Sequence, residues 1–279
     1  MIKKAFKILF TITGFGMLWY LEQMQPLRRQ TQNRVSRALV NVGLAGFTFA
    51  VIVGSNWLLI RPTLSLVSRK KIGLLNRVSV PPRLRRLLAF LWLDYTLYIW
   101  HRLNHRLPFF WRFHLVHHSD LDMDTSTSVR FHFGELFLSI LFRILQIAAI
   151  GAEHIDLLVF DNVLLVAIRF HHSNLRLPTA FEKKLNFVIV TPRMHGIHHS
   201  IVLEETNSNW STVFSFWDKL HGSFVSDVPQ SQITIGVPAY RDPEELRLAN
   251  LLGLPFRPLR PWLLPDGATP ARQLPGFER

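Results

Sequence analysis

The sequence predicts an all-α protein, with a helical core integrated in a membrane and a helical cap that carries a polyhistidine site. Three observations support this fold class. Hydrophobic residues make up 48% of the 279 residues, and the mean hydropathy is +0.17, which is high for a soluble enzyme. Several apolar runs are long enough to enter a bilayer. After residue 100, 11 of the 13 histidines fall into compact groups, which scattered structural histidines would not do.

Two apolar runs open the chain. Residues 6–21 form an apolar run that follows Lys3 and Lys4 and holds Lys7 near its start, as in a signal peptide. No small-residue cleavage pattern follows, so we expect a retained first span. Residues 38–60 contain no charged side chain and are long enough to cross a bilayer. The sequence therefore predicts an N-terminal membrane region over residues 1–86, in which 61–86 is a basic connector.

The orientation in the membrane depends on residues 87–100, an apolar run interrupted only by Asp94. Residues 61–86 carry eight Lys or Arg and no acid. If 87–100 crosses the membrane, the positive-inside rule places the histidines outside the cytoplasm. A cytoplasmic site instead requires 61–86 to lie in the plane of the other face, or 87–100 to be re-entrant.

Two further apolar runs, 136–150 and 155–169, predict a helical hairpin that returns the chain to the side it left. Arg143 and Asp161 are almost equally far from its turn. We expect these two side chains to pair, because ionisable groups at this depth are costly alone. The predicted regions are completed by a domain over 87–224 that carries the histidine boxes and a C-terminal cap or tail over 225–279, which holds nine of the 16 prolines.

Net charge and cysteine content exclude several classes of function. The formal net charge of +13 lies mostly in short segments that flank the apolar runs, so it indicates membrane contact rather than a nucleic-acid partner. The chain has no cysteine, which excludes disulfides, thiolate ligands and iron–sulfur clusters. Aromatic residues near the first histidines, Tyr98 and Trp100 among them, suit a membrane interface.

The histidine spacings predict metal binding. His101 and His105 are four residues apart and share one helix face. The adjacent His117 and His118 diverge by about 100° around a helix, so one can bind one ion and its neighbour a second ion. Eight to ten imidazoles are too many for one four-coordinate zinc and suit two metals about 3.5–4 Å apart. The predicted ligands from the three boxes are His101, His105, His114, His117, His118, His195, His198 and His199.

These boxes and their flanks resemble the fatty acid hydroxylase/sterol desaturase superfamily, over about half of the chain. The resemblance rests on three boxes in order together with their flanking motifs: Asp94-Tyr-x-x-Tyr-x-x-His101-Arg-x-x-His105, Leu-Pro-x-x-Trp-Arg-Phe-His114-x-x-His-His, Arg130-Phe-His132-x-x-Glu135, His172-Ser-Asn174-x-x-Leu-Pro and Thr191-Pro-Arg-Met-His195-x-x-His-His. Three departures lie outside the boxes. The family often has proline after the histidine that matches His132, where this chain has Phe133. The family often has Asn-Tyr/Phe-Gly where this chain has Asn209-Trp-Ser, and Asp-Arg-Leu-Phe-Gly-Thr where it has Asp218-Lys-Leu-His-Gly-Ser.

The resemblance implies a membrane-bound di-iron oxygenase that hydroxylates or desaturates an unactivated C–H bond of a lipid. It implies two iron ions (zinc is possible in purified protein), O2 as co-substrate, and electrons from an external ferredoxin- or cytochrome-type system. It adds His132 and His172 as ligands, with no catalytic residue beyond the metal ligands. Asp94 lies seven residues before His101 on the same helix face, so it is expected either to orient a ligand ring or to pair with an arginine. Glu135 and Asn174 are expected either to orient ligands in the same way or to cap helix ends. The expected location is a bacterial inner membrane, multi-pass, with the metal site cytoplasmic.

Two alternatives remain at this point. A zinc-dependent hydrolase would need a general base beside an open metal position, for which Glu135 is the candidate. A non-catalytic metal-binding membrane protein would keep the boxes without the chemistry. The residues do not identify the substrate or distinguish hydroxylation from desaturation.

Overall fold

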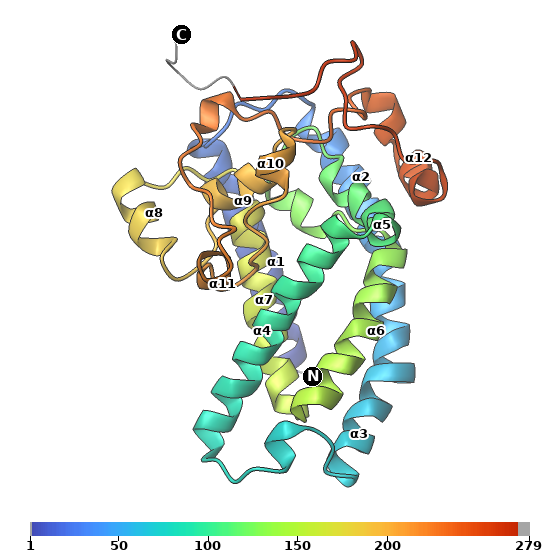
Figure 1. Ribbon diagram of the computed structural model, residues 1–279, viewed down its shortest axis with the longest axis vertical. Helices are drawn as coiled ribbons and strands as arrows, with labels where there is room; N and C mark the ends of the chain where they lie inside the picture. Colours follow the sequence, from blue (N-terminus) through green and yellow to red (C-terminus); the bar gives the residue numbers. More distant parts are fainter. Residues whose placement is uncertain (1, 273–279) are drawn as a thin grey trace.

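The computed structural model of the chain describes residues 2–272, with side chains from residue 13 onward. These residues form helices and isolated bridges but no β-strand. Helices α1 (Ile2–Met24), α2 (Arg34–Ser55), α3 (Arg61–Arg69), α4 (Pro82–Arg106), α6 (Phe133–Ile150) and α7 (His154–His172) run along the long axis (Figure 1). The shorter helices gather at one end and form a cap: α5 (Pro108–His118), α8 (Thr179–Leu185), α9 (Pro192–His198), α10 (Leu203–Thr206), α11 (Phe216–Leu220) and α12 (Leu248–Gly253).

Helices α2 and α3 form one continuous rod, joined by a π-helical turn over Asn56–Ile60. The N–H of Arg61 bonds to the carbonyl of Asn56, five residues earlier. Pro62 has no N–H and its ring would collide with an α-helical carbonyl four residues earlier, so a wider turn at this point accommodates it. The predicted connector 61–86 therefore begins as helix, and the predicted span 38–60 lies inside the rod.

Helix α4 carries the first histidine box from the far end of the molecule to the cap. It starts at the Pro81-Pro82 pair and runs the length of the molecule (Figure 1). It ends at Leu107, which is extended because Pro108 follows, and α5 starts at once. Since α4 is continuous through 87–100, the basic residues of the 61–86 segment lie at the end opposite the histidines.

The predicted hairpin forms as α6 and α7, joined at Gly151, whose φ of +80° favours glycine. The turn packs against the α3–α4 connection so closely that a Cβ on Gly73 would lie 2.1 Å from the Gly151 nitrogen. Within the hairpin, Nη2 of Arg143 lies 3.8 Å from Oδ1 of Asp161, which confirms the predicted pair.

Two hydrophobic clusters hold the molecule together, one toward each end. The first joins α3, the start of α4 and the α6–α7 hairpin, around Leu93, Ile147 and Phe160. The second joins α2, α5 and the C-terminal segment, around Leu44 and Leu251. Each cluster combines residues from more than one of the three predicted regions, so the Pro-rich C-terminal segment is packed onto the core as far as residue 272.

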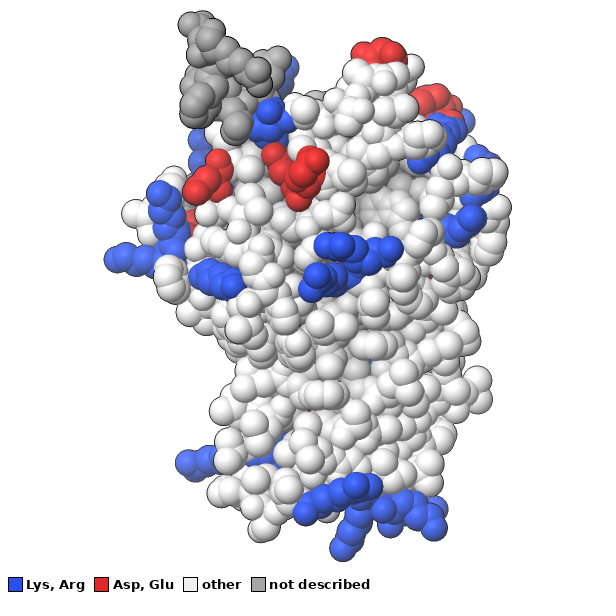
Figure 2. All heavy atoms as spheres, in the orientation of Figure 1, with Lys and Arg blue, Asp and Glu red and all other residues white. Residues whose placement is uncertain are grey.

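The bundle of long helices (α1 to α4, α6 and α7) has an apolar surface of the kind a membrane covers. Among the described residues, the helical stretches Arg34–Asn76 and Phe133–Ile150 are long and apolar enough to cross a membrane. Leu58 is 76% exposed and Leu145 64%. Figure 2 shows a band nearly free of charged residues between a basic lower end and a cap that bears both signs. The first predicted span lies in α1, partly outside the described side chains.

Candidate dimetal site

Nine of the ten predicted ligands meet in two adjoining groups where α4, α5, α7 and α9 converge. Within each group, one ring nitrogen of every member lies within 4.8 Å of those of the others. The two groups touch, because the rings of His118 and His199 stack with centroids 4.3 Å apart. The first group is His101, His105, His114, His118 and His198, and the second is His117, His172, His195 and His199.

The helix geometry divides adjacent histidines between the groups, as the sequence predicts. On α5, His117 points to the second group and His118 to the first. At the end of α9, His198 belongs to the first group and His199 to the second. Each His-His pair therefore serves both groups from one short helix.

Backbone carbonyls orient four of the rings through their Nδ1 atoms. Carbonyl oxygens accept hydrogen bonds only, so these Nδ1 atoms carry the proton and their Nε2 lone pairs face the site. Sequence reasoning missed these partners because every residue has a carbonyl and no side chain marks it. The pairs are His101 with Trp210 at 2.8 Å, His117 with Arg130 at 3.0 Å, His172 with Ile168 at 2.8 Å and His198 with Ser208 at 2.8 Å.

One carboxylate contacts a ring as predicted, and two other predicted orienting residues lie elsewhere. Oε1 of Glu135 is 2.8 Å from Nδ1 of His114. Asp94 accepts the Trp217 indole N–H at 2.8 Å and two backbone N–H groups. Asn174 exchanges two hydrogen bonds with the backbone of Arg28. Asp94 and Asn174 thus position segments that cover the site, rather than its imidazoles.

The second group fits a cation at its centre. Nε2 of His172 lies 3.1 Å from Nε2 of His117 and 3.0 Å from Nε2 of His195. Since His117 and His172 each donate through Nδ1, two lone pairs face each other, which is unfavourable unless a positive ion lies between them. Metal–imidazole bonds of about 2.1 Å at about 90° place ligand nitrogens about 3.0 Å apart. The observed spacing suits a metal.

Burial favours the neutral form of five histidines, divided between the two groups. Desolvation, followed by repulsion from neighbouring imidazoles, lowers the pKa of His117, His118, His195, His198 and His199 well below the ordinary value. Neutral imidazole is the form that binds a metal. In the first group, Nε2 of His105 and Nε2 of His198 are buried without a hydrogen-bond partner and are available to bind a metal.

Two other histidines lie beside the groups but outside them. His132, a predicted ligand, is the N-cap of α6: its Nδ1 accepts from the Gly134 N–H at 3.0 Å and its Nε2 donates to the Leu252 carbonyl at 3.2 Å. Both of its nitrogens are therefore occupied. The buried His171 ring lies 4.1 Å from the His195 ring, between centroids, and belongs to neither group.

A buried ionic cluster holds the loop that follows the second box. Arg37 on α2 donates to Asp120 at 2.8 Å and to Asp124 at 2.8 Å. Arg130, fully buried, bonds to the carbonyl of Val116 and to Asn41 on α2. The same Arg130 supplies the carbonyl that orients His117, so α2 fixes the second group through this loop.

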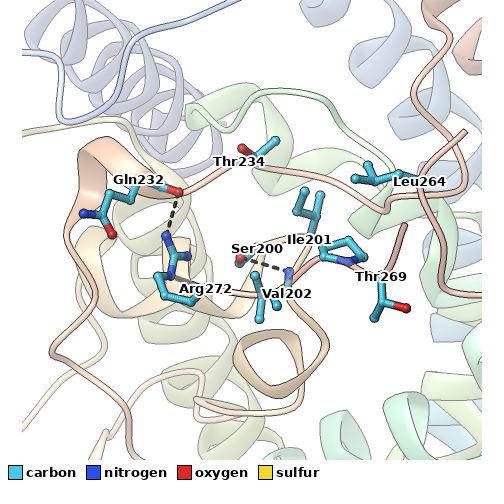
Figure 3. Close-up of a pocket in the computed structure, with 10 residues that line it drawn as sticks. Ser200, Ile201, Val202, Gln232, Thr234, Leu264, Thr269 and Arg272 are labelled. Atoms are coloured by element: carbon cyan, nitrogen blue, oxygen red, sulfur yellow. Dashed lines mark hydrogen bonds between the residues drawn. The ribbon is translucent and has the colours of Figure 1, made fainter. Parts of the chain in front are cut away.

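A cavity of about 720 Å³ lies just beyond the third box (Figure 3). Its lining includes Ser200, the residue after His199, and Arg272, which donates to the Gln232 carbonyl at 2.6 Å. None of the nine grouped histidines lines it. It is therefore a feature of the C-terminal covering and not of the metal site.

Comparison with known proteins identifies the family of the central region. The model of the fatty acid hydroxylase family matches residues 86–223, just under half of the chain. This stretch contains all ten predicted ligands. Residues 86–223 therefore match the fatty acid hydroxylase family, in agreement with the resemblance seen in the boxes.

The curated relatives are lipid-modifying enzymes of this superfamily. The chain is 27% identical to ornithine lipid hydroxylase OlsE of Rhizobium tropici over 78% of its own length and 64% of the relative's. It is 26% identical to cholesterol 25-hydroxylase of Mus musculus over 54% and 50% of the two chains. It is 29% identical to alkylglycerol monooxygenase of Homo sapiens over 50% and 30%. The chain thus spans less than two thirds of each relative's length. No solved structure matches.

Proposed function

We propose that this protein is a membrane-bound di-iron oxygenase that inserts oxygen into, or desaturates, an unactivated C–H bond of a lipid. The observation that carries the proposal is the pair of adjoining groups of imidazoles, five in one and four in the other. Two irons held there would supply O2 activation. Imidazole ligation alone also suits zinc, so the choice of iron rests on family membership.

The proposed task of the chain is to hold two ions and keep water away. His101, His105, His114, His118 and His198 would bind one, and His117, His172, His195 and His199 the other. Carbonyl contacts and Glu135 fix the ring orientations before any metal binds, which limits the reorganisation needed at the site. We propose that His132 acts instead as a helix cap, because both its nitrogens are occupied.

The relatives support a lipid substrate and favour hydroxylation over desaturation. Their names state hydroxylation of ornithine lipid or cholesterol, or monooxygenation of alkylglycerol. The site lies at the cap end of the apolar bundle of long helices, so a hydrocarbon chain could reach it from the bilayer. We propose substrates of this chemical kind, a lipid with a polar head and an apolar body.

We propose a multi-pass protein of the bacterial inner membrane, with an external ferredoxin- or cytochrome-type donor. A cytoplasmic site gives access to soluble reductants and agrees with the resemblance. The charge pattern argues for the opposite orientation, because the basic 61–86 segment lies at the far end from the histidines. Labelling of single-cysteine variants from each side of the membrane distinguishes the two orientations.

The hydrolase alternative is weakened by the surroundings of Glu135. A hydrolase would need a free carboxylate as general base beside an open metal position. Here Oε1 of Glu135 accepts from Nδ1 of His114, so this carboxylate orients a ligand. The non-catalytic alternative makes no distinct structural demand and is separated by product analysis.

Comparative lipid mass spectrometry tests the proposal. Cells would express the wild type or His117→Ala at matched levels, with a competent electron donor. A lipid that gains one oxygen only with the wild type supports a hydroxylase, and loss of two hydrogens supports a desaturase. No difference in several lipid backgrounds, with both proteins folded, would contradict the oxygenase and favour a metal-binding scaffold.

A further inference from the structure

A row of aromatic rings connects the metal site to the surface of the molecule. The Trp210 ring centroid lies 6.5 Å from that of His105 and 6.4 Å from that of Tyr98. Tyr98 lies 6.4 Å from Tyr95, which is 4.8 Å from Trp217. Tyr95 and Trp217 are partly exposed, whereas Trp210 and Tyr98 are buried. Every step is short enough for an electron to pass between neighbouring rings.

Tyr98 is buried completely, contrary to the expected role in a membrane interface, and its hydroxyl has a path for its proton. The hydroxyl lies 3.1 Å from Oγ of Ser223, which donates to Oδ1 of Asp218 at 2.7 Å. Burial raises the pKa of Asp218, so this carboxylate is a better proton acceptor than one in water. A tyrosine loses its proton when it loses an electron, and this chain of groups can accept it.

Trp210, unlike Tyr98, lies beside positive charges and has no group that can accept its proton. The guanidinium carbons of Arg102 and Arg106 lie 5.3 and 5.6 Å from its ring centroid. Its indole nitrogen is buried without a hydrogen-bond partner. Nearby positive charge disfavours a further positive charge on the ring, and no acceptor can take the indole proton. An electron vacancy on Trp210 would therefore pass on to Tyr98.

We propose, on the basis of the proposed oxygenase function, that Trp210, Tyr98 and Tyr95 form an escape route for oxidising equivalents when the oxidised metal centre has no lipid to react with. Trp210 gives one electron to the centre and takes one from Tyr98. The Tyr98 proton moves to Ser223 as the Ser223 proton moves to Asp218. Tyr95 restores the electron to Tyr98, the proton returns from Asp218, and the Tyr95 phenol proton enters solvent. A soluble thiol then gives Tyr95 a hydrogen atom.

The direction of electron transfer, toward the metal centre, follows from the chemistry of the side chains. Tryptophan and tyrosine give up an electron only to a strong oxidant, so the row does not carry electrons from a low-potential donor in ordinary turnover. It operates when a strong oxidant persists beside His105. Two of the departures from the family pattern lie on this route: Trp210 in the altered Asn209-Trp-Ser motif, and His221 beside Tyr98, their ring centroids 5.1 Å apart.

A photochemical experiment tests the route without iron chemistry. Because the chain has no cysteine, Arg106→Cys provides one site for a ruthenium photo-oxidant next to Trp210, in zinc-loaded protein in nanodiscs. After a flash, transient absorption should show a tryptophan radical that converts to a tyrosyl radical. In Tyr98→Phe the tyrosyl signal should be lost and the tryptophan radical should persist. Tyr240→Phe, which removes a buried tyrosine of the cap, is the matched control. Identical traces in Tyr98→Phe and the control would overturn the proposal.

A second arm uses the reduced, iron-loaded protein mixed with O2 in the absence of lipid. A tyrosyl radical in the electron paramagnetic resonance spectrum should be absent in Tyr98→Phe. Mass spectrometry should show more oxidised His101 and His105 in Trp210→Phe than in the wild type. Radical transfer in the photochemical arm with none in the iron arm would count against the oxidising centre. Absence of transfer in the photochemical arm refutes the route itself.

Discussion

His117 and His172 face each other through their Nε2 atoms, each of which presents a lone pair and no hydrogen. Their Nε2 atoms are 3.1 Å apart, while their Nδ1 atoms bond to the carbonyls of Arg130 and Ile168. The two rings come from α5 and α7, which are distant in sequence and meet only at the cap. Such an arrangement is stable when a cation lies between the two lone pairs, and this is the structural basis for the second metal site that we propose.

Replacing His117 should remove the metal of the second group. We expect His117→Ala to retain about half of the metal of the wild type, because the first group keeps its five histidines. The measurement is metal analysis of purified protein by mass spectrometry. His132→Ala is the control, since His132 caps α6 and both of its nitrogens are occupied. Metal loss in His132→Ala equal to that in His117→Ala would contradict this assignment.

Glu135 should tune the first group through His114. Removal of such an orienting partner typically weakens metal affinity about 10–100-fold, and we expect this for Glu135→Ala. Glu135→Gln keeps an acceptor oxygen at the same reach and should lose less. Competition titration with a chelator measures both affinities. Equal affinity in the wild type and Glu135→Ala would show that the 2.8 Å contact does not orient the ligand.

The buried pair of Arg37 and Asp120 should contribute strongly to stability. Burial raises the pKa of Asp120, but Arg37 and Arg130 outweigh it and hold the pKa at about 2. The ionised carboxylate therefore stabilises the fold at neutral pH, and this contribution is lost as pH falls below 3.8 toward 2. Removing one partner of a buried pair costs about 3–5 kcal/mol, so Arg37→Ala should lower the unfolding temperature in detergent markedly.

The exposed pair of Arg247 and Glu244 provides the comparison. Their side chains are 69% and 65% exposed, and such pairs contribute about 0–1 kcal/mol. Arg247→Ala should therefore leave the unfolding temperature nearly unchanged. A similar small shift for Arg37→Ala would mean that the ionic cluster does not hold the loop after the second box.

Sequence reasoning found the helices and most of the site because both follow local rules. Histidine spacing on a helix predicted how His117 and His118 would divide between two groups, and apolar runs predicted α6, α7 and the Arg143–Asp161 contact. It could not find the carbonyls of Trp210 or Ser208, since any residue provides one. Motif position alone suggested His132 as a ligand. Its Nδ1 instead caps α6 at Gly134, and its Nε2 bonds to the carbonyl of Leu252, a contact that depends on how the C-terminal segment folds back.

The two ends of the bundle of long helices, the basic end and the end that carries the cap, should lie on opposite sides of the membrane. The absence of native cysteines permits single-cysteine variants Lys70→Cys, at the basic end, and Glu204→Cys, in the cap, both at exposed positions. We expect an impermeant maleimide to label only one of them in intact cells and the other after membrane opening. Labelling of both from the same side would contradict the transmembrane arrangement. Labelling of only Lys70→Cys in intact cells would place the histidines in the cytoplasm.

The central claim is that the histidine groups direct oxygen from O2 into a lipid. The most direct measurement is lipid mass spectrometry after growth under ¹⁸O₂, comparing the wild type with His117→Ala at equal expression. Hydroxylation, the outcome favoured by the relatives, predicts a lipid that carries one ¹⁸O atom with the wild type and is absent with His117→Ala. A product whose new oxygen comes from water, or an identical product with His117→Ala, would contradict the oxygenase.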